Sequence, residues 1–211
     1  MSLLPTKHRH DTDILDLAVP ALAGLAADPL VSLVDTAFVG QLGATPLGAL
    51  GVNASIFSMA FVVFNFLAYG TTPRVGRALG EGDTEAAGRV VIQALTLAVV
   101  SGLLALGLLQ LLADPILRLM GATGQLHGPA LDYLRIRALA GPAVLLISAS
   151  RGAFRGFQDT RTPMVVTLFL NLVNLLLDPL LIFGLGWGLV GAATATATAQ
   201  WCGALIFVYL L

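Results

Sequence analysis

Three aspartates interrupt apolar stretches of this chain, where ionised side chains are rare. Asp28 and Asp35 lie in the run LAADPLVSLVDTAFVG, and Asp178 lies in NLVNLLLDPLLIFG. In a bilayer, a charged side chain at the centre of a helix costs about 3 kcal/mol, so it usually faces a cavity or a partner and marks a functional site. These carboxylates are therefore the first candidates for chemistry.

The spacing of the aspartates, and of two asparagines near Asp178, places these polar side chains on common faces of the helices. Asp28 and Asp35 are seven positions apart, which is two helical turns, so they share a face. Asn171, Asn174 and Asp178 follow the pattern i, i+3, i+7 and also share one. We therefore expect two helices that each present a polar stripe.

We interpret Asp35, Asn174 and Asp178 as a site for a proton or a small cation such as Na⁺. No basic residue is expected in the middle of a span to neutralise the carboxylates, so they must bind a proton or a cation. The alternative is that these groups only join helices by hydrogen bonds, which is the reading we prefer for Asn171 alone. Asp28 precedes a proline, and for this residue simple exposure to water remains an alternative.

Two threonines in the last apolar segment are expected to pack between alanines, namely Thr194 and Thr198. Thr196, between them, offers a hydroxyl oxygen that suits Na⁺ or another hard ion as well as a hydrogen bond. Its position makes it a further candidate ligand for the cation.

Tyr133 lies near the end of another apolar segment. A tyrosine in such a place more often anchors a helix at the membrane interface than binds a ligand. The nearby Arg135 and Arg137 are expected to extend outward to the aqueous phase.

The composition is that of an integral membrane protein. Of the 211 residues, 57% are hydrophobic and only 11% are charged, about half the charged fraction of a soluble domain. Eleven basic against twelve acidic residues leave a net charge of −1, so there is no basic surface for nucleic acid. The one cysteine, Cys202, excludes an internal disulfide and a cysteine-based metal cluster.

Six apolar segments are long enough to cross a bilayer as helices. None shows sustained apolar/polar alternation, so we predict an all-α integral membrane protein, a bundle of six transmembrane helices over residues 14–211. Residues 1–13 form a polar tail, with no apolar core or cleavage site typical of a signal peptide. The predicted helices are residues 14–40, 46–71, 90–112, 131–157, 162–184 and 189–211.

Basic residues favour one side of this six-helix arrangement. Eight of the eleven lie in the tail or in the loops between the second and third and between the fourth and fifth helices. The positive-inside rule then predicts a multi-pass protein of the plasma (inner) membrane with both termini in the cytoplasm. The longest of these loops, residues 73–89, is expected to be a short interfacial helix or a solvated turn.

Several classes of activity lack their residues in this sequence. The three histidines, His8, His10 and His127, lie in the tail or a loop, so none can serve a nucleophile in the membrane. No GxxxxGK[ST] phosphate loop and no HExxH motif occurs. We therefore expect a protein that is not an enzyme, has no organic cofactor, and is a secondary transporter.

Three stretches resemble the multidrug and toxic compound extrusion (MATE) family, and in particular its DinF-type branch. They are residues 30–40 (LVSLVDTAFVG), 156–164 (GFQDTRTPM) and 171–184 (NLVNLLLDPLLIFG). The resemblance implies a six-helix lobe whose cavity opens alternately to either side of the membrane. It also implies export of cationic and other amphipathic organic compounds in exchange for H⁺ or Na⁺.

The resemblance also implies roles for individual residues. The cation site of the amino-terminal lobe falls on Asp35, Asn174, Asp178 and Thr196, and Tyr133 lines the same cavity. We add two residues to the candidate substrate cavity, Asn171 and Asp28, although Asp28 lies outside the family pattern.

Members of the family have twelve helices in two lobes, and this chain corresponds to the first six. We expect it to act as half of such a transporter or to be a truncated form, with a second six-helix lobe or a second copy of itself as partner. One alternative is a flippase for lipid-linked precursors, which needs cationic residues in the cavity to hold phosphates, and none is expected here. Another is a helix bundle or fragment that does not transport.

Overall fold

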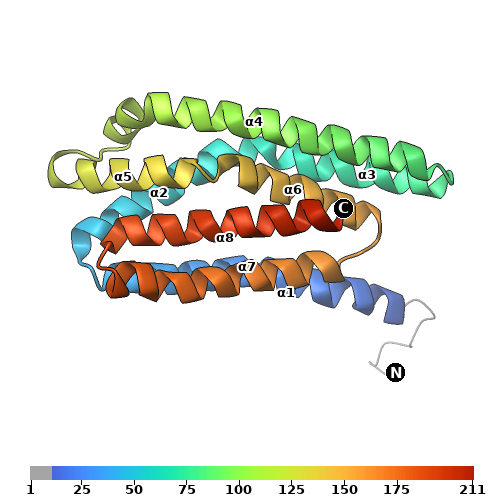
Figure 1. The fold of residues 1–211 in the computed structure, drawn as a ribbon, viewed down its shortest axis with the longest axis horizontal. Helices are drawn as coiled ribbons and strands as arrows, with labels where there is room; N and C mark the ends of the chain where they lie inside the picture. The colour runs from blue at the N-terminus through green and yellow to red at the C-terminus, as the bar shows by residue number, and fades with distance from the viewer. Residues whose placement is uncertain (1–10) are drawn as a thin grey trace, which may run out of the picture.

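A computed structural model describes residues 11–211, and all of its regular elements are helical (Figure 1). This confirms the prediction of an all-α bundle. The elements are α1 (Asp11–Gly40), α2 (Ala44–Val62), η1 (Val63–Asn65), α3 (Phe66–Gly80), α4 (Thr84–Leu119), η2 (Gly124–Leu126), α5 (His127–Ala138), α6 (Gly141–Gly156), α7 (Arg161–Pro179), η3 (Leu180–Gly184) and α8 (Gly188–Leu210).

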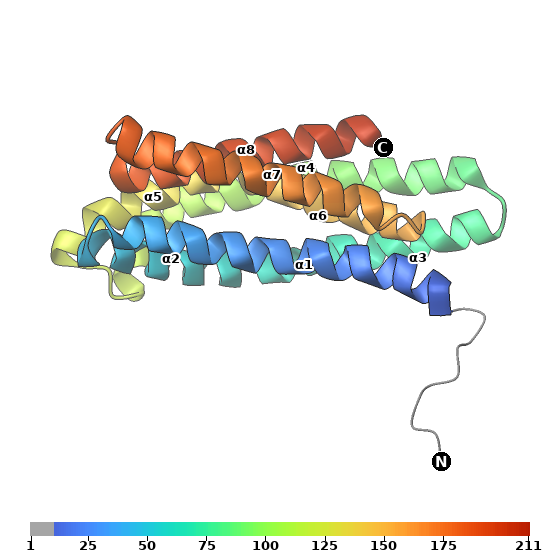
Figure 2. The same cartoon turned by 90° about the horizontal axis from the view of Figure 1, so that it is seen from below.

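These elements form long rods that run up and down along one axis (Figures 1 and 2). Three rods are composite, because α2, η1 and α3 follow one another directly, as do α7 and η3, and α5 and α6 are separated by two residues. Within the described residues, four rods are long and apolar enough to cross a membrane, which supports a multi-pass membrane protein. They are Ala44–Gly80, Thr84–Leu119, Arg161–Gly184 and Gly188–Leu210.

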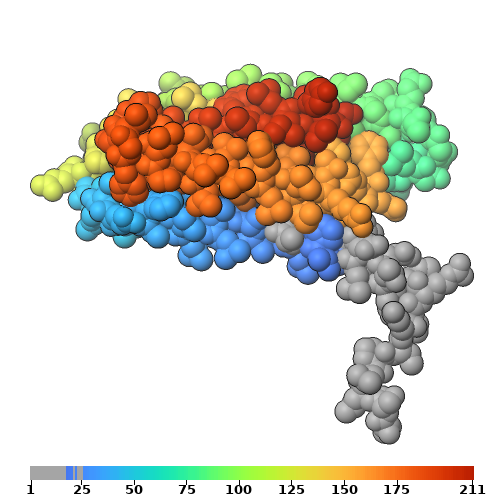
Figure 3. Space-filling model, turned by 60° about the horizontal axis from the view of Figure 1, so that its bottom comes forward, coloured from blue at the N-terminus to red at the C-terminus, as the bar shows by residue number. Residues whose placement is uncertain are grey.

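The helices pack in a defined set of pairs. α4 packs against α3 and α6, while α1 lies along α7, and α8 contacts α5, α6 and α7. Figure 3 shows the face on which α7 and α8 form a continuous surface with α1 and α2 along its edge. Many large apolar side chains on the outside of the bundle are exposed, Leu111, Leu119 and Tyr209 among them, as expected for surfaces that meet lipid.

The expected loop at residues 73–89 is mostly helix. α3 continues to Gly80 and α4 begins at Thr84, so only three residues form the turn. Asp83 accepts a hydrogen bond from the Ala86 backbone N–H at 2.7 Å and caps α4, while Glu85 and Arg89 form an i,i+4 ion pair within its first turns. The charged residues in this stretch thus stabilise the start of a helix. Sequence composition alone does not distinguish such a helix end from a solvated loop.

The expected helix 131–157 is divided into α5 and α6. The break precedes Pro142, which lies in the first turn of α6, where its missing N–H costs no hydrogen bond. Gly102 of α4 packs directly against it, since a Cβ on this glycine would lie 2.4 Å from the Pro142 Cα. The start of α6 can therefore approach α4 closely only because residue 102 has no side chain.

A second irregularity follows Asp178. α7 ends at Pro179 and the chain continues as a π-helix, η3, a form that often accompanies functional sites. Gly191 of α8 fits against this stretch, because a Cβ there would lie 2.7 Å from the Leu181 carbonyl carbon.

We expect Gly102→Ala to destabilise the bundle by about 1–3 kcal/mol, because the new methyl group meets the backbone of Pro142, which cannot move aside freely. Gly107→Ala in the same helix is the matched control, since nothing lies within 4 Å of its Cβ position. Equilibrium unfolding of both variants in SDS micelles measures the difference. Equal stability of the two variants would contradict this account of the α4–α6 contact.

Candidate functional site

A cavity of about 650 Å³ lies within the bundle, lined by residues of every α-helix in the described part of the chain except α4. Six of the seven residues selected from the sequence line it. They are Asp28, Asp35, Tyr133, Asn171, Asn174 and Thr196.

The seventh residue, Asp178, is fully buried beside this cavity. Its carboxylate and that of Asp35 lie within hydrogen-bonding reach of each other. The structure thus brings together all seven residues, which come from α1, α5, α7 and α8.

The two carboxylates lack donors. Among the described residues, none donates a hydrogen bond to Oδ1 of Asp35 or to either oxygen of Asp178, although all three atoms are buried. An ionised carboxylate only accepts hydrogen bonds, so two of them stabilise each other only if a proton or a cation lies between them. The arrangement is therefore chemically suited to hold a shared proton or a small cation.

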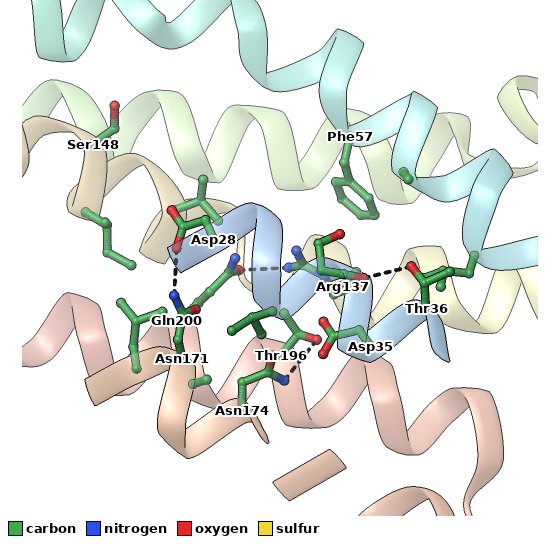
Figure 4. A pocket seen from close by; sticks show the side chains of 18 of the residues that line it. Asp28, Asp35, Thr36, Phe57, Arg137, Ser148, Asn171, Asn174, Thr196 and Gln200 are labelled. Atoms are coloured by element: carbon green, nitrogen blue, oxygen red, sulfur yellow. Dashed lines mark hydrogen bonds between the residues drawn. The ribbon is translucent and has the colours of Figure 1, made fainter. Parts of the chain in front are cut away.

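Neutral oxygen atoms lie next to this carboxylate pair. Asn174 is buried and donates from Nδ2 to the Thr196 Oγ1 at 3.5 Å, and that hydroxyl donates in turn to the Ala192 carbonyl at 2.9 Å. Figure 4 shows the Asp35 carboxylate on the side of Asn174 and Thr196. Carboxylate, amide and hydroxyl oxygens are the ligands that hard cations prefer.

Asp28 does not simply face water. Its Oδ2 accepts from both terminal nitrogens of Arg151, at 3.2 and 3.3 Å, and its Oδ1 accepts from the Asn171 Nδ2 at 3.0 Å. Arg151 also donates to the Thr167 hydroxyl at 2.8 Å. This network joins α1 to α6 and α7 at one end of the cavity.

The expectation that Arg137 points outward is wrong. Its side chain lines the cavity, donates to the Gln200 Oε1 at 2.8 Å and lies over the Phe57 ring (Figure 4). Arg135, on the same helix, is exposed. The sequence spacing already indicated that Arg137 faces the cavity, because Arg137 follows Tyr133 by four residues and so lies on the same helix face.

Three arginines in fact line the cavity, namely Arg137, Arg151 and Arg155. The argument that no cationic side chain was available to a flippase is therefore wrong. It assumed that an arginine near the end of an apolar segment faces water, whereas all three of these side chains reach the cavity.

The sequence matches a known protein family. Residues 20–180 match the model of the MatE family. The chain belongs to the MatE family. This match confirms the resemblance seen in the sequence, and the family is one of membrane transporters rather than enzymes.

Relatives within the MatE family align with nearly all of the chain. It is 37% identical to the chloroplastic protein DETOXIFICATION 44 of Arabidopsis thaliana, over 94% of this chain and 40% of that protein. It is 33% identical to DNA damage-inducible protein F of Escherichia coli K12, over 93% of this chain and 43% of that protein. The second match supports the DinF-type resemblance.

The fold matches solved MATE structures. An outward-facing multidrug resistance MATE family transporter superposes with a TM-score of 0.87 at 28% identity, over 93% of this chain and 44% of that one. The chain thus spans less than half the length of the relatives it matches and corresponds to one lobe.

We expect the Asp28–Arg151 pair to contribute a coupling energy of about 1 kcal/mol, because the arginine is largely buried while the aspartate remains partly screened by water. A double-mutant cycle with Asp28→Asn and Arg151→Gln, followed by unfolding in SDS, measures it. The exposed Glu85–Arg89 pair is the control, for which a few tenths of a kcal/mol are expected. Equal coupling energies for the two pairs would contradict a bridging role for Asp28.

Proposed function

We propose that this chain is one lobe of a secondary active exporter that exchanges small cationic or amphipathic organic compounds for H⁺ or Na⁺. The observation that carries the proposal is the pair of neighbouring carboxylates, Asp35 and Asp178, with three buried oxygens that receive no hydrogen bond within the described residues. The pair adjoins a cavity of about 650 Å³, which is large enough for a drug-sized molecule. The multidrug resistance transporter of similar fold adds support.

The exchange follows from competition for negative charge. A proton or Na⁺ held between Asp35 and Asp178, with Asn174 and Thr196 as further ligands, neutralises the pair. The cavity then attracts a cationic substrate less, and the substrate leaves. When the ion departs, the negative charge returns and favours the next substrate, so the two ligands bind in opposition.

α1 is suited to move during this exchange. It carries Asp35 and contains two prolines, Pro20 and Pro29, each of which removes one backbone hydrogen bond and allows bending. It packs mainly against α7, the helix that carries Asp178. When an ion neutralises Asp35 and Asp178, the electrostatic repulsion between α1 and α7 is lost. Ion binding can therefore change the position of α1 relative to α7.

A complete transporter requires a second lobe. We propose that another six-helix lobe or a second copy of this chain supplies it, because the chain matches less than half of each relative. We further propose a plasma (inner) membrane location with both termini in the cytoplasm, which the distribution of basic residues supports.

Replacing the carboxylates tests the proposal. In proteoliposomes loaded with a fluorescent organic cation, we expect Asp35→Asn and Asp178→Asn each to lower efflux driven by a pH or Na⁺ gradient by about tenfold or more. Asp132→Asn is the matched control, because Asp132 is exposed on α5 and outside the cavity. Its efflux should equal that of the unchanged chain.

Each result has a defined meaning. Efflux that persists in the Asp35→Asn/Asp178→Asn double variant would refute the ion-exchange role of the pair. Absence of efflux from the unchanged chain, correctly inserted in the liposomes, would refute transport by copies of this chain alone. Co-reconstitution with a second six-helix lobe would then be the decisive comparison.

The hydroxyl of Thr196 distinguishes between the two coupling ions. Thr196→Val keeps the shape of the side chain but removes a neutral ligand, which is expected to weaken Na⁺ binding about tenfold and to leave proton binding unchanged. Thr194→Val is the control, because Thr194 also donates to its own helix, at 2.8 Å to the Val190 carbonyl, but does not line the cavity. Binding of radioactive ²²Na⁺ to purified protein is the measurement. Equal binding by both variants would exclude Thr196 as a ligand.

A further inference from the structure

A polar cluster lies outside the cavity, at the turn that joins α4 to α5. His127, the first residue of α5, has its Nδ1 3.0 Å from the Ala122 carbonyl oxygen and its Nε2 2.8 Å from the Asp114 Oδ1. Asp114, on α4, also pairs through Oδ2 with the Arg118 Nε at 2.8 Å. Figure 1 shows this turn at the end of the bundle opposite the carboxyl terminus.

The two contacts of the His127 ring need two protons. A backbone carbonyl and an ionised carboxylate only accept hydrogen bonds, and a neutral imidazole has a single N–H to donate. Only the imidazolium can therefore donate to Ala122 and Asp114 at the same time. The side chain is 21% exposed, so water reaches it and it can exchange protons with the aqueous phase.

The charged groups that face the ring come from α4. Asp114 contacts it directly, and Arg118 is paired with that carboxylate. α2, which packs against η2 and α5, contains no charged residue. The other titratable residues of α5, and those of α8, which also packs against α5, form no hydrogen bond or ion pair with the ring within the described part of the chain: Asp132, Tyr133, Arg135, Arg137, Cys202 and Tyr209.

The start of α5 is held from two sides. On the side of α2, Leu126 lies against Gly48, whose Cβ position is 3.3 Å from the Leu126 Cδ1. The Asn53 Nδ2 of α2 also donates to the Ala130 carbonyl at 3.0 Å. On the side of α4, the contact is the one that His127 makes with Asp114. Of these contacts, only the last depends on a titratable proton.

We propose that His127 and Asp114 form a proton-dependent latch that fastens the start of α5 to the end of α4 and is closed when the imidazole ring is protonated. The proposal goes beyond the transport function and does not depend on it. In the orientation proposed above, the latch lies on the side of the membrane away from the cytoplasm and responds to the pH of that compartment. Because α5 also carries Tyr133 in the cavity wall, opening the latch frees one end of a helix that lines the cavity.

The direction of the response follows from the protonated form. Loss of one ring proton breaks one of the two hydrogen bonds and leaves a nitrogen lone pair facing an acceptor oxygen. The latch therefore stabilises the turn at low pH, and this stabilisation is lost as the pH rises through the range in which histidine titrates, about pH 5–8. Carboxylates and arginines of ordinary pKa do not change charge in that range.

Hydrogen exchange at the turn measures the latch. The amides of Gly121 and Ala122 donate to the Arg118 and Leu117 carbonyls and open with the turn. In the full chain in lipid nanodiscs, with rates corrected for the intrinsic effect of pH, we expect their protection to fall about tenfold from about pH 5.5 to about pH 8.5, as loss of one charge-assisted hydrogen bond predicts.

The turn between α3 and α4 is a matched control within the same molecule. There the amides of Gly82 and Asp83 donate to the Leu79 and Ala78 carbonyls in the same pattern, and the glycine has φ +77° where Gly121 has +81°. This turn contains no histidine. Its protection should not change over the same pH range.

Two variants show whether the pH dependence belongs to the latch. His127→Gln keeps a side-chain donor that does not titrate, so the pH dependence at Gly121 and Ala122 should disappear. Asp114→Asn offers a neutral oxygen in place of the carboxylate and should reduce it, because the hydrogen bond is no longer charge-assisted on both sides.

Each outcome decides for or against the latch. Protection that is independent of pH in the unchanged chain, or that changes equally in the α3–α4 turn or in His127→Gln, overturns it. A pH dependence that requires His127 supports it, even if the chain shows no ion-driven efflux and the transport function is rejected.

Discussion

The structure depends on the high cost of ionised carboxylates inside an apolar bundle. Asp178 is fully buried and lies against Asp35, and the described residues supply no hydrogen-bond donor to three of their four oxygens. Two such groups remain together only if a proton or cation joins them, because both the loss of hydration and their mutual repulsion oppose ionisation. The neighbouring Asn174 and Thr196 provide the polar environment that makes this arrangement tolerable.

The arginines of the cavity obey the same constraint in different ways. Arg151 is compensated by Asp28 and by the Thr167 hydroxyl, so its charge serves to connect α1 with α6. Arg137 donates to Gln200 and lies over the Phe57 ring, and its charge interacts with the Asp35 carboxylate. A bundle in lipid tolerates these charges only toward its interior, and both arginines accordingly line the cavity together with the acidic residues of α1.

Two interruptions of the helices lie close in sequence to residues of the site. The break between α5 and α6 lies two residues after Arg137 and is accommodated by Gly102. The π-helix that follows Pro179 begins two residues after Asp178, and Gly191 allows α8 to pack closely against it. Each irregular segment packs one side against protein, at Ala140 and at Ile182, while Leu139, Leu180 and Phe183 are exposed.

The sequence by itself determined the membrane class, the all-helical architecture and the group of polar residues around Asp35 and Asp178. These features depend on local composition and on the helical period, which places residues four and seven apart on one face. Only the tertiary structure decided the roles of Asp28, Arg137 and Arg151. Whether a charge near the end of an apolar segment faces water or a cavity depends on how helices distant in sequence pack, and on where each rod is interrupted. Local sequence does not contain that information, because the partner of Asp28 lies 123 residues away.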